Sequence, residues 1–437
     1  MLNNKICRGL AAAFVAAALS ACGGSDNNDS VATVRLVNAM QTHQSINMLS
    51  GGTAVISGTA IDTVSTYSGV TAGSPILQVN DASTNTALAT LAPSVAAGAH
   101  YVLVAYESGG VGRTTIINED TAQPATGTAS LRVFQAATDA GAIDVYVTDP
   151  ATNIATLTSP TFSFGSSTSL QTSSFLSISP GTYRLRITGA GNPADLRLDL
   201  PSFVLTNQQV ASVILTPTIG GTLVNAGVLV QQADYTPGRN TTARVRLAAA
   251  VSGNAVVSAS AASAAVATSV VAPTVTGYAV VPSGTPLTIT VNGAPVASPV
   301  TSLPAGGDST LFVYGAPGST TASLITDDNH LTNTTSSLKM RMINGLTGAA
   351  TPLTLNAAFA VIASNVAPGA ASSYAVVGAT TPLQLDVFAT SSPTPIYSTT
   401  TTGSGAPLSL PGNSVYTLFM LGDAAARPPI VLLRKDR

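Results

Sequence analysis

Charged side chains are scarce in this 437-residue chain: Asp, Glu, Lys and Arg make up only 8% of it, and the formal net charge is −2. An ordinary soluble domain carries about 25% of these residues. Nucleic-acid binding is excluded, because neutralising phosphates requires clustered Lys and Arg. A coiled coil is excluded by the shortage of Glu and Lys. A charged disordered tail is excluded by the 45% hydrophobic content.

Tryptophan is absent, and only two cysteines and three histidines occur. His43, His100 and His330 have none of the spacings that bring imidazoles onto one metal ion, so we expect solvated or capped surface residues. No Gly-x-Ser-x-Gly elbow, phosphate loop or dinucleotide fingerprint is present. The aromatic platform common in sugar-binding proteins is also missing, since Phe and Tyr reach only 5%. We therefore predict no enzymatic activity and no cofactor.

The N-terminus has the pattern of a secretion signal. Lys5 and Arg8 precede an apolar run over residues 9–19, which is about half of the ~20 residues that a membrane-spanning helix needs. The run closes with Leu19-Ser20-Ala21-Cys22, which resembles the bacterial lipobox. The alternative is an ordinary secretory signal followed by a chance cysteine. The other cysteine, Cys7, lies within the segment to be removed, so no disulfide is expected.

The lipobox resemblance implies a signal peptide over residues 1–21 and a lipid-bearing, palmitoylated Cys22 at the start of a flexible tether, 22–30. Several acyl chains suffice to hold a protein on a membrane. In Gram-negative lipoproteins an Asp directly after the cysteine marks inner-membrane retention. Gly23 stands there instead, so the resemblance favours the outer membrane, with the lipid on Cys22 as the membrane contact.

The rest of the chain repeats one pattern four times, at intervals of about a hundred residues, the size of a small β-sandwich. Each copy opens with apolar residues on both sides of an arginine, and glycine turns then lead to two further strand-like segments. β-branched residues dominate, and Pro and Gly interrupt most helical windows. We predict an all-β chain of four tandem antiparallel, immunoglobulin-like β-sandwich domains, at 31–120, 126–234, 240–328 and 336–437.

The arginine that opens each copy alternates with apolar residues, so it should point away from the core of its own sandwich. We expect its stem to cover the sheet or its guanidinium to pair with an acid, and Asp144 is the expected partner of the second copy's arginine. A row of ligand-binding arginines is the alternative. The four are Arg35, Arg132, Arg246 and Arg341.

One segment between copies is a weak candidate for a calcium site. Asp327, Asp328 and Asn329 offer the oxygen ligands that Ca²⁺ takes, but no acidic partner motif accompanies them. A solvated turn between sandwiches is the favoured interpretation. The same interpretation applies to Glu119 and Asp120.

The second copy carries a family resemblance. Its Arg-containing strand, 130–137, is followed by Asp144-Val145-Tyr146-Val147 and by Ser179-Pro180-Gly181. This arrangement resembles a bacterial domain of unknown function that occurs in tandem in secreted and lipid-anchored proteins. The resemblance implies an immunoglobulin-like sandwich and an envelope location, and it implies no activity. The first copy matches less well, and the last two lack the acidic strand.

Together these patterns predict a non-enzymatic, lipid-anchored protein of the bacterial cell envelope that serves as a scaffold, spacer or adhesion module. The first alternative is an envelope lipoprotein that binds polysaccharide or peptide in grooves between domains. The second is a hydrolase with a dispersed active site, which the shortage of His, Glu and Lys disfavours.

Overall fold

The computed structural model describes residues 30–332, 334–348, 351–390, 392–399, 408–424 and 428–437. The predicted signal peptide and Cys22 lie outside the described residues. In the described part, strands dominate and form four consecutive sandwiches, so the predicted all-β tandem fold is confirmed. The same part contains no helix that is long and apolar enough to cross a membrane.

The first sandwich stacks a sheet of order β4-β1-β7-β8 on a sheet of order β3-β2-β5-β6. Val34, Leu36, Met48 and Leu103 lie in its core. The strands are β1 (Val31–Ala39), β2 (Ser45–Ser50), β3 (Thr53–Ala60), β4 (Ser68–Thr71), β5 (Leu77–Asp81), β6 (Ala87–Leu91), β7 (His100–Ser108) and β8 (Val111–Asn118).

The second sandwich pairs a sheet of order β12-β9-β16-β17-β18, with β13 also on β9, with a sheet of order β11-β10-β14-β15. Two short 3-10 turns, η2 (Thr138–Ala140) and η3 (Ile154–Thr156), interrupt it. The strands are β9 (Ala129–Gln135), β10 (Ile143–Thr148), β11 (Phe162–Phe164), β12 (Gln171–Thr172), β13 (Leu176–Ile178), β14 (Gly181–Gly189), β15 (Asn192–Leu205), β16 (Val210–Pro217), β17 (Val224–Val230) and β18 (Tyr235–Gly238).

The third sandwich combines a sheet of order β22-β19-β26-β27, with β23 also on β19, and a sheet of order β21-β20-β24-β25. Small residues fill much of its core, as at Ala249 and Ala259. The strands are β19 (Thr242–Val251), β20 (Val256–Ala261), β21 (Ala264–Val271), β22 (Thr274–Val275), β23 (Ala279–Pro282), β24 (Leu287–Val291), β25 (Ala294–Val296), β26 (Asp308–Gly315) and β27 (Thr321–Thr326).

The fourth sandwich repeats this plan, with sheets of order β31-β28-β35-β36, with β32 also on β28, and β30-β29-β33-β34. Methionines such as Met340 and Met342 lie in its core. The strands are β28 (Ser337–Thr347), β29 (Leu353–Ala357), β30 (Ala360–Val366), β31 (Ala370–Ala371), β32 (Ala375–Gly378), β33 (Leu385–Ala389), β34 (Pro395–Ser398), β35 (Val415–Asp423) and β36 (Ile430–Lys435).

Each sandwich contains one parallel strand pair within its otherwise antiparallel sheets. The Arg-bearing first strand lies beside a late strand that runs in the same direction: β1 beside β7, β9 beside β16, β19 beside β26 and β28 beside β35. A parallel pair needs a long crossover, and the strands of the opposite sheet provide it. Side-chain alternation alone could not reveal this pairing.

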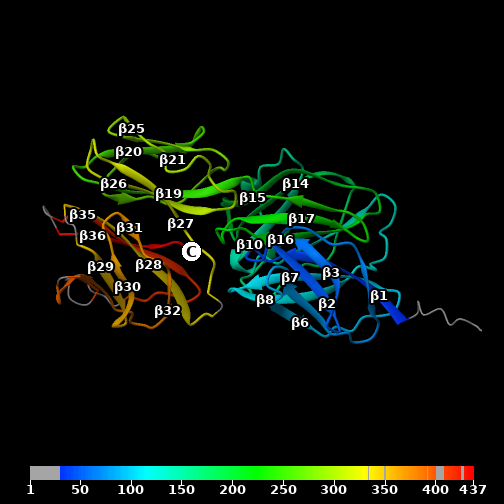
Figure 1. Cartoon of the computed structure of the whole chain (residues 1–437). Helices are drawn as coiled ribbons and strands as arrows, with labels where there is room; N and C mark the ends of the chain where they lie inside the picture. Colours follow the sequence, from blue (N-terminus) through cyan, green and yellow to red (C-terminus); the bar gives the residue numbers. More distant parts are fainter. Residues whose placement is uncertain (1–29, 333, 349–350, 391, 400–407, 425–427) are drawn as a thin grey trace, which may run out of the picture.

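The sandwiches associate in two lobes because the sheets that hold the first strands are apolar on both faces (Figure 1). Along β1, alternate side chains enter the core of the first sandwich, while Val37 on the opposite face packs against Phe134 and Ile214 of the second. The third and fourth sandwiches meet in the same way, and Phe312 and Phe419 belong to one apolar cluster across that interface. The predicted outward face of each first strand is therefore an interface.

Two arginines cross the interface between the third and fourth sandwiches. Arg246 pairs with Asp436, which follows the last strand of the fourth sandwich. Arg341 pairs with Asp327, which follows the last strand of the third. Both guanidiniums are 2% exposed and both carboxylates are fully buried. Burial opposes the charge on Arg246, but Asp436 and Asp327 raise its pKa.

The first lobe has a related arrangement with one carboxylate. Arg35 pairs with Glu119 and donates to the carbonyl oxygen of Val230 in the second sandwich at 2.9 Å. Arg132 has no acid in contact among the described residues and donates to the carbonyl oxygen of Asn118 at 3.4 Å. Burial lowers the pKa of Arg132, and the charge of Glu119 opposes that change.

Every one of these arginines also stacks on an aromatic ring that directly precedes an edge strand. The guanidinium carbon lies 4.5–5.0 Å from the ring centroid, within the range of a cation–π contact. In three copies the ring is a tyrosine whose hydroxyl donates to the buried carboxylate. The four pairs are Arg35–Tyr67, Arg132–Phe175, Arg246–Tyr278 and Arg341–Tyr374.

Three sequence expectations are corrected here. Asp144 is not the partner of Arg132, because β10 and β9 lie in opposite sheets; Asp144 accepts from Ser163 and from the Gly191 N–H. Glu119 and Asp327 do not lie in solvated turns but are 3% and 0% exposed. Each follows a last strand and enters the interface, where it compensates an arginine.

The two lobes meet through a glycine turn of the second sandwich. The N–H of Gly220 donates to the Gly306 carbonyl at 3.0 Å, and the Gly220 carbonyl accepts from Asn329 N–H at 3.2 Å. Gly221 has a φ of +84°, and a Cβ there would lie 2.6 Å from the main-chain nitrogen of His330. The close approach of the lobes therefore requires glycine at position 221.

Arg246→Met should lower the free energy of unfolding by about 3–5 kcal/mol, because Asp436 would remain buried without its cation. Urea unfolding of the purified protein measures this loss. The matched control is Arg113→Met, which removes an exposed arginine of β8 and should change stability by no more than about 0.5 kcal/mol. Equal effects of the two substitutions would contradict the role of Arg246.

Gly221→Ala should separate or loosen the lobes, because its Cβ would meet the backbone of residues 329 and 330. The expected result is a lower melting temperature and a larger radius of gyration in small-angle X-ray scattering. Gly253→Ala is the control, since Gly253 has a similar φ of +73° but nothing within 4 Å of its Cβ position. It should cost only the left-handed backbone strain of about 1–2 kcal/mol, with no change in radius.

Candidate functional site

A cavity of about 460 Å³ lies where the two lobes meet. Residues of three sandwiches and of the segment between β27 and β28 line it, so none of the sandwiches forms it alone. Its charged groups are Glu107 at the end of β7, Asp139 in η2, Asp328 and His330 in the connecting segment, and Lys339 on β28.

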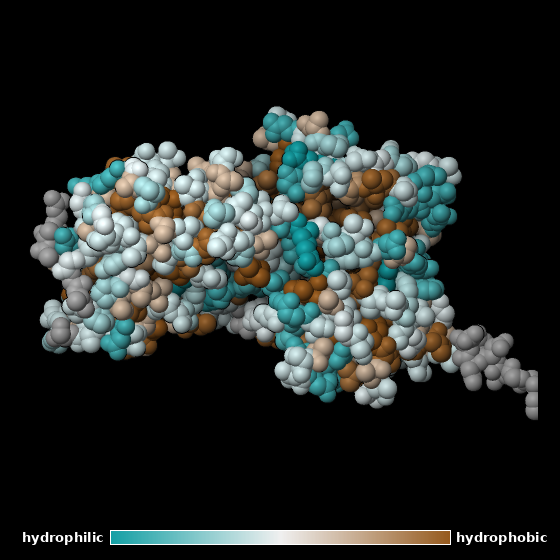
Figure 2. Space-filling view, turned by 45° about the horizontal axis from the view of Figure 1, so that its top comes forward, coloured by the Kyte–Doolittle hydropathy of each residue, from teal (hydrophilic) through white to brown (hydrophobic). Residues whose placement is uncertain are grey.

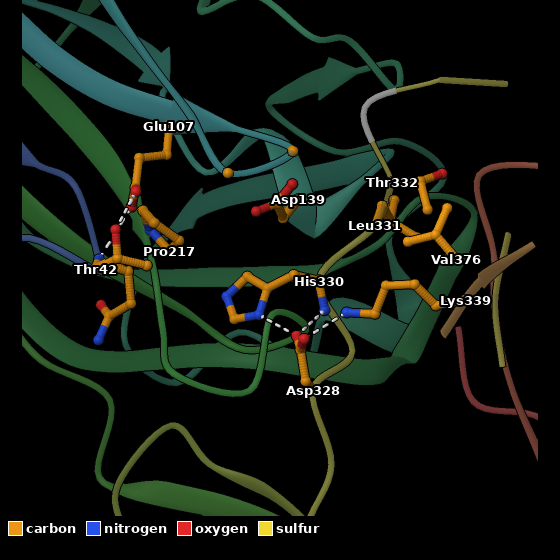
Figure 3. A pocket seen from close by; sticks show the side chains of 13 residues that line it. Thr42, Glu107, Asp139, Pro217, Asp328, His330, Leu331, Thr332, Lys339 and Val376 are labelled. Atoms are coloured by element: carbon orange, nitrogen blue, oxygen red, sulfur yellow. Dashed lines mark hydrogen bonds and ion pairs between the residues drawn. The ribbon is translucent and has the colours of Figure 1, made fainter. Parts of the chain in front are cut away.

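Asp328 is the centre of the charged wall in Figure 3. Its carboxylate contacts His330 Nδ1 at 2.7 Å and Lys339 Nζ at 2.6 Å. Burial raises the pKa of Asp328, but the His330 hydrogen bond and Lys339 outweigh it and hold the pKa well below its usual value. Burial likewise opposes protonation of His330, yet Asp328 and Asp139 raise its pKa.

Glu107 forms the opposite wall (Figure 3). Its carboxylate accepts from the main-chain N–H of Thr42 at 3.0 Å and from the Thr42 hydroxyl. His43 Nε2 lies 3.9 Å away. Glu107 is therefore held in place by the loop that follows β1.

Asp139 is the least compensated acid of the cavity. It is 8% exposed, and in the part of the chain that the structure describes no cationic side chain lies within 4 Å of its carboxylate oxygens. Burial raises the pKa of Asp139, while His330 and the Gly109 N–H oppose this shift. The cavity thus contains a desolvated carboxyl group and a histidine, and the pKa of each is raised.

The geometry of His330 does not form a catalytic dyad with a nucleophile. Asp328 orients the imidazole through Nδ1, as in a base–orienter pair, but the buried Nε2 has no hydrogen-bond partner among the described residues. An acid–base triad requires a hydroxyl or thiol within hydrogen-bond reach of that nitrogen. The cavity as described offers polar contacts to a small ligand.

The sequence-predicted site residues are dispersed across the molecule. His43 and His100 lie in the first sandwich beside Asp81 and Asp120, at 2.8 and 2.9 Å. His330, expected on the surface, lies in the cavity with its Nε2 buried. The cause is the docking of the lobes, which covers the segment between β27 and β28.

The calcium candidates Asp327 and Asp328 point to different partners. Asp327 contacts Arg341 within the interface, whereas Asp328 contacts His330 and Lys339 in the cavity. Among the residues that the structure describes, no group of three His, Cys, Asp or Glu side chains is arranged to hold a metal ion.

Sequence reasoning did not single out Glu107, Asp139 or Lys339 as site residues, because they come from different copies and share no motif. Of the aromatic rings before the edge strands, the sequence indicated only Tyr67, as a core or edge packing residue, and not Phe175, Tyr278 or Tyr374. An alignment of the four copies would have shown them, since an aromatic residue recurs at the same place in each copy.

Residues 32–146 match the model of a family described as a domain of unknown function, DUF4397. This match confirms the resemblance to a bacterial domain of unknown function. It covers the first sandwich and the beginning of the second, whereas the motifs that suggested the resemblance lie mainly in the second copy. No curated protein sequence matches the chain.

Two solved structures illustrate the weak structural similarities. One is a protein from Bacteroides uniformis whose proposed role is cell adhesion: it is 10% identical, has a TM-score of 0.20, and the match covers 47% of this chain and 99% of that one. The other is the Bacillus anthracis TIE protein: it is 10% identical, has a TM-score of 0.13, and the match covers 91% of this chain and 69% of that one. Scores this low carry no argument about fold or function.

Asp139→Asn should stabilise the protein at pH 7 and lose that advantage in acid. Because burial raises the pKa of Asp139 above its ordinary value of 3.8, the folded state holds this proton more tightly, so stability falls as the pH rises through the shifted pKa. The neutral amide avoids this penalty. Melting temperatures from pH 3 to pH 8 measure the difference.

The control for this titration is Asp234→Asn, which changes an exposed acid. It should leave the pH profile of the melting temperature unaltered. A gain from Asp139→Asn that persists below the ordinary pKa of aspartate would contradict a burial effect on Asp139.

Proposed function

We propose that the chain is a non-enzymatic protein of the bacterial cell envelope, held on the membrane by lipid on Cys22, that acts as a rigid adhesion or scaffold module. The observation that carries this proposal is the packing of the four sandwiches into one body: apolar interfaces join them in pairs, buried arginine–carboxylate pairs cross the interface of the second lobe, and main-chain hydrogen bonds of Gly220 join the lobes. Charged groups that could otherwise perform chemistry stabilise interfaces instead. The outer sheets and the hairpins would then form a rigid surface to which partners bind.

The packing favours a scaffold or adhesion role over an extended spacer. The first two sandwiches fold back on one another face to face, as do the last two, and the C-terminus lies between the lobes (Figure 1). Four sandwiches stacked in this way span less distance than four in a line. Their covered faces leave the outer sheets and the hairpins as the contact surface.

The outer surface suits contacts that do not depend on charge. On the face shown in Figure 2, weakly polar residues predominate, apolar residues are scattered, and hydrophilic residues gather along the boundary between the lobes. Phe359 is 78% exposed in the turn between β29 and β30, where its φ is +66°. We therefore expect the exposed ring of Phe359 to contact a partner.

The second candidate function is ligand binding between the domains, for polysaccharide or peptide. The cavity at Asp328 and His330 supports it, because it is lined by residues of both lobes and carries several polar groups. A hydrolase remains the least favoured alternative, since His330 Nε2 faces no nucleophile among the described residues.

Cys22→Ala should abolish incorporation of a labelled fatty acid and move the protein from the membrane fraction to the soluble fraction, since its thiol is the proposed attachment point. Metabolic labelling and cell fractionation measure both effects. Cys7→Ala is the matched control and should remain labelled and membrane-bound. Persistent labelling of Cys22→Ala would rule out the anchor.

Crosslinking in intact cells tests the adhesion or scaffold role directly. Wild-type protein should give discrete adducts with envelope components, and Phe359→Ser should reduce those that form at the fourth sandwich. Crosslinking of the protein only to itself, or turnover of a substrate by the purified protein, would contradict the proposal.

A further inference from the structure

A second cavity, of about 360 Å³, lies at the junction around the last residue of the chain. Three arginines from three different sandwiches line it: Arg197 on β15, Arg244 on β19 and Arg437 after β36. Figure 1 places the C-terminus between the two lobes, which is where this cavity lies.

Two of the three arginines have a carboxylate partner. Arg197 contacts Asp195 at 2.7 Å, and Arg244 contacts Asp308 at 2.8 Å. Asp436 also lines the cavity, but its carboxylate is occupied by Arg246 in the interface between the third and fourth sandwiches.

Arg437 has no side-chain carboxylate within 4 Å in the described part of the chain. Its guanidinium donates to the main-chain carbonyl oxygens of Asp139, at 3.0 Å, and Ala140. Its own main-chain oxygen faces another way and accepts from the Val415 N–H at 3.2 Å. Arg437 thus places a positive charge in the cavity, and among the described residues no side-chain carboxylate is in contact with it.

The surroundings of Arg437 agree with this charge excess. Burial, together with the positive charges of Arg197 and Arg244, lowers the pKa of Arg437 to about 9, against the opposing effects of Asp308 and Asp195. A buried cation without a partner is costly. A bound anion would remove that cost.

The cavity also has room and neutral hydrogen-bonding groups for a ligand. A Cβ on Gly141, where φ is +68°, would lie 3.2 Å from an Arg437 guanidinium nitrogen and 3.6 Å from the Ser166 hydroxyl. The missing side chain leaves this space open, and Asn413 also lines the cavity.

We propose that this cavity binds the anionic group of a ligand, a carboxylate or a phosphate, between the guanidiniums of Arg197, Arg244 and Arg437. Planar guanidiniums match the oxygens of both groups, which they can contact through two parallel hydrogen bonds. The inference rests on the second candidate function, ligand binding between the domains, and adds a second cavity to it. It gives that role a chemical class, since acidic sugars and phosphorylated groups both present such oxygens.

The test is calorimetric titration of the purified protein with inorganic phosphate and, separately, with glucuronate. Glucose and sodium chloride at matched ionic strength are the ligand controls. We expect saturable binding of at least one anion, together with a higher melting temperature. Preference for glucuronate assigns the site to carboxylated sugars, and preference for phosphate assigns it to phosphorylated groups.

Arg197→Gln and Arg437→Gln should each weaken anion binding at least tenfold. Arg184→Gln is the matched control, since Arg184 is ion-paired to Asp199 on the neighbouring strands β14 and β15 but does not line the cavity. Circular dichroism verifies that each variant is folded. If Arg437→Gln disturbs the junction, Arg197→Gln still decides the question.

The proposal is overturned if neither anion stabilises the protein beyond matched sodium chloride, or if both cavity variants bind as tightly as the wild type. If Arg437→Gln only lowers the melting temperature while no anion binds, Arg437 is a structural clamp on the Asp139–Ala140 turn. Because the titration uses purified protein, its outcome does not depend on lipid attachment or adhesion in the cell.

Discussion

The arrangement of the molecule depends on an arginine that is buried between two β-sheets, stacked on an aromatic ring and compensated by a carboxylate. A guanidinium in this position cannot be left unpaired without a large cost, so the facing sheets must stay together. In the second lobe the compensation crosses the interface: Arg246 uses Asp436 and Arg341 uses Asp327. Arg246 also lies 3.7 Å from Asp327 of its own sandwich, but its closer ion pair, with Asp436, crosses the interface.

The second sandwich is the informative exception. Its ring is Phe175, and Gln231 follows β17, the strand whose counterparts in the other copies lead to an acid. Both the hydroxyl and the carboxylate are therefore lost, and Arg132 relies on main-chain and hydroxyl oxygens. Among the described residues, Glu119 is the one carboxylate in direct contact with either first-strand arginine of the first lobe, Arg35 or Arg132. The interface between the first two sandwiches therefore has one carboxylate paired with a first-strand arginine, whereas the interface between the last two has two, Asp327 and Asp436.

The scarcity of charge has a structural consequence at the junction of the lobes. Although the chain has few charged residues, many of them lie where sandwiches meet. These residues make the two cavities between the lobes polar. The first cavity presents three carboxyl groups, an imidazole and the Lys339 ammonium, and the second presents three guanidiniums beside the carboxylates of Asp195 and Asp436. Both exist only because Gly220 and Gly221 let the backbones of the two lobes approach closely.

The sequence by itself determined the four sandwiches and their Arg-bearing first strands, because alternation and turn residues are local properties. It could also place Arg35 and its counterparts on the face opposite the core. Only the tertiary structure decided that this face is buried, that Glu119 and Asp327 enter it, and that Asp139, His330 and Arg437 meet between the lobes. These contacts join residues that are distant along the chain, and no local sequence pattern indicates which sheet faces pack against each other.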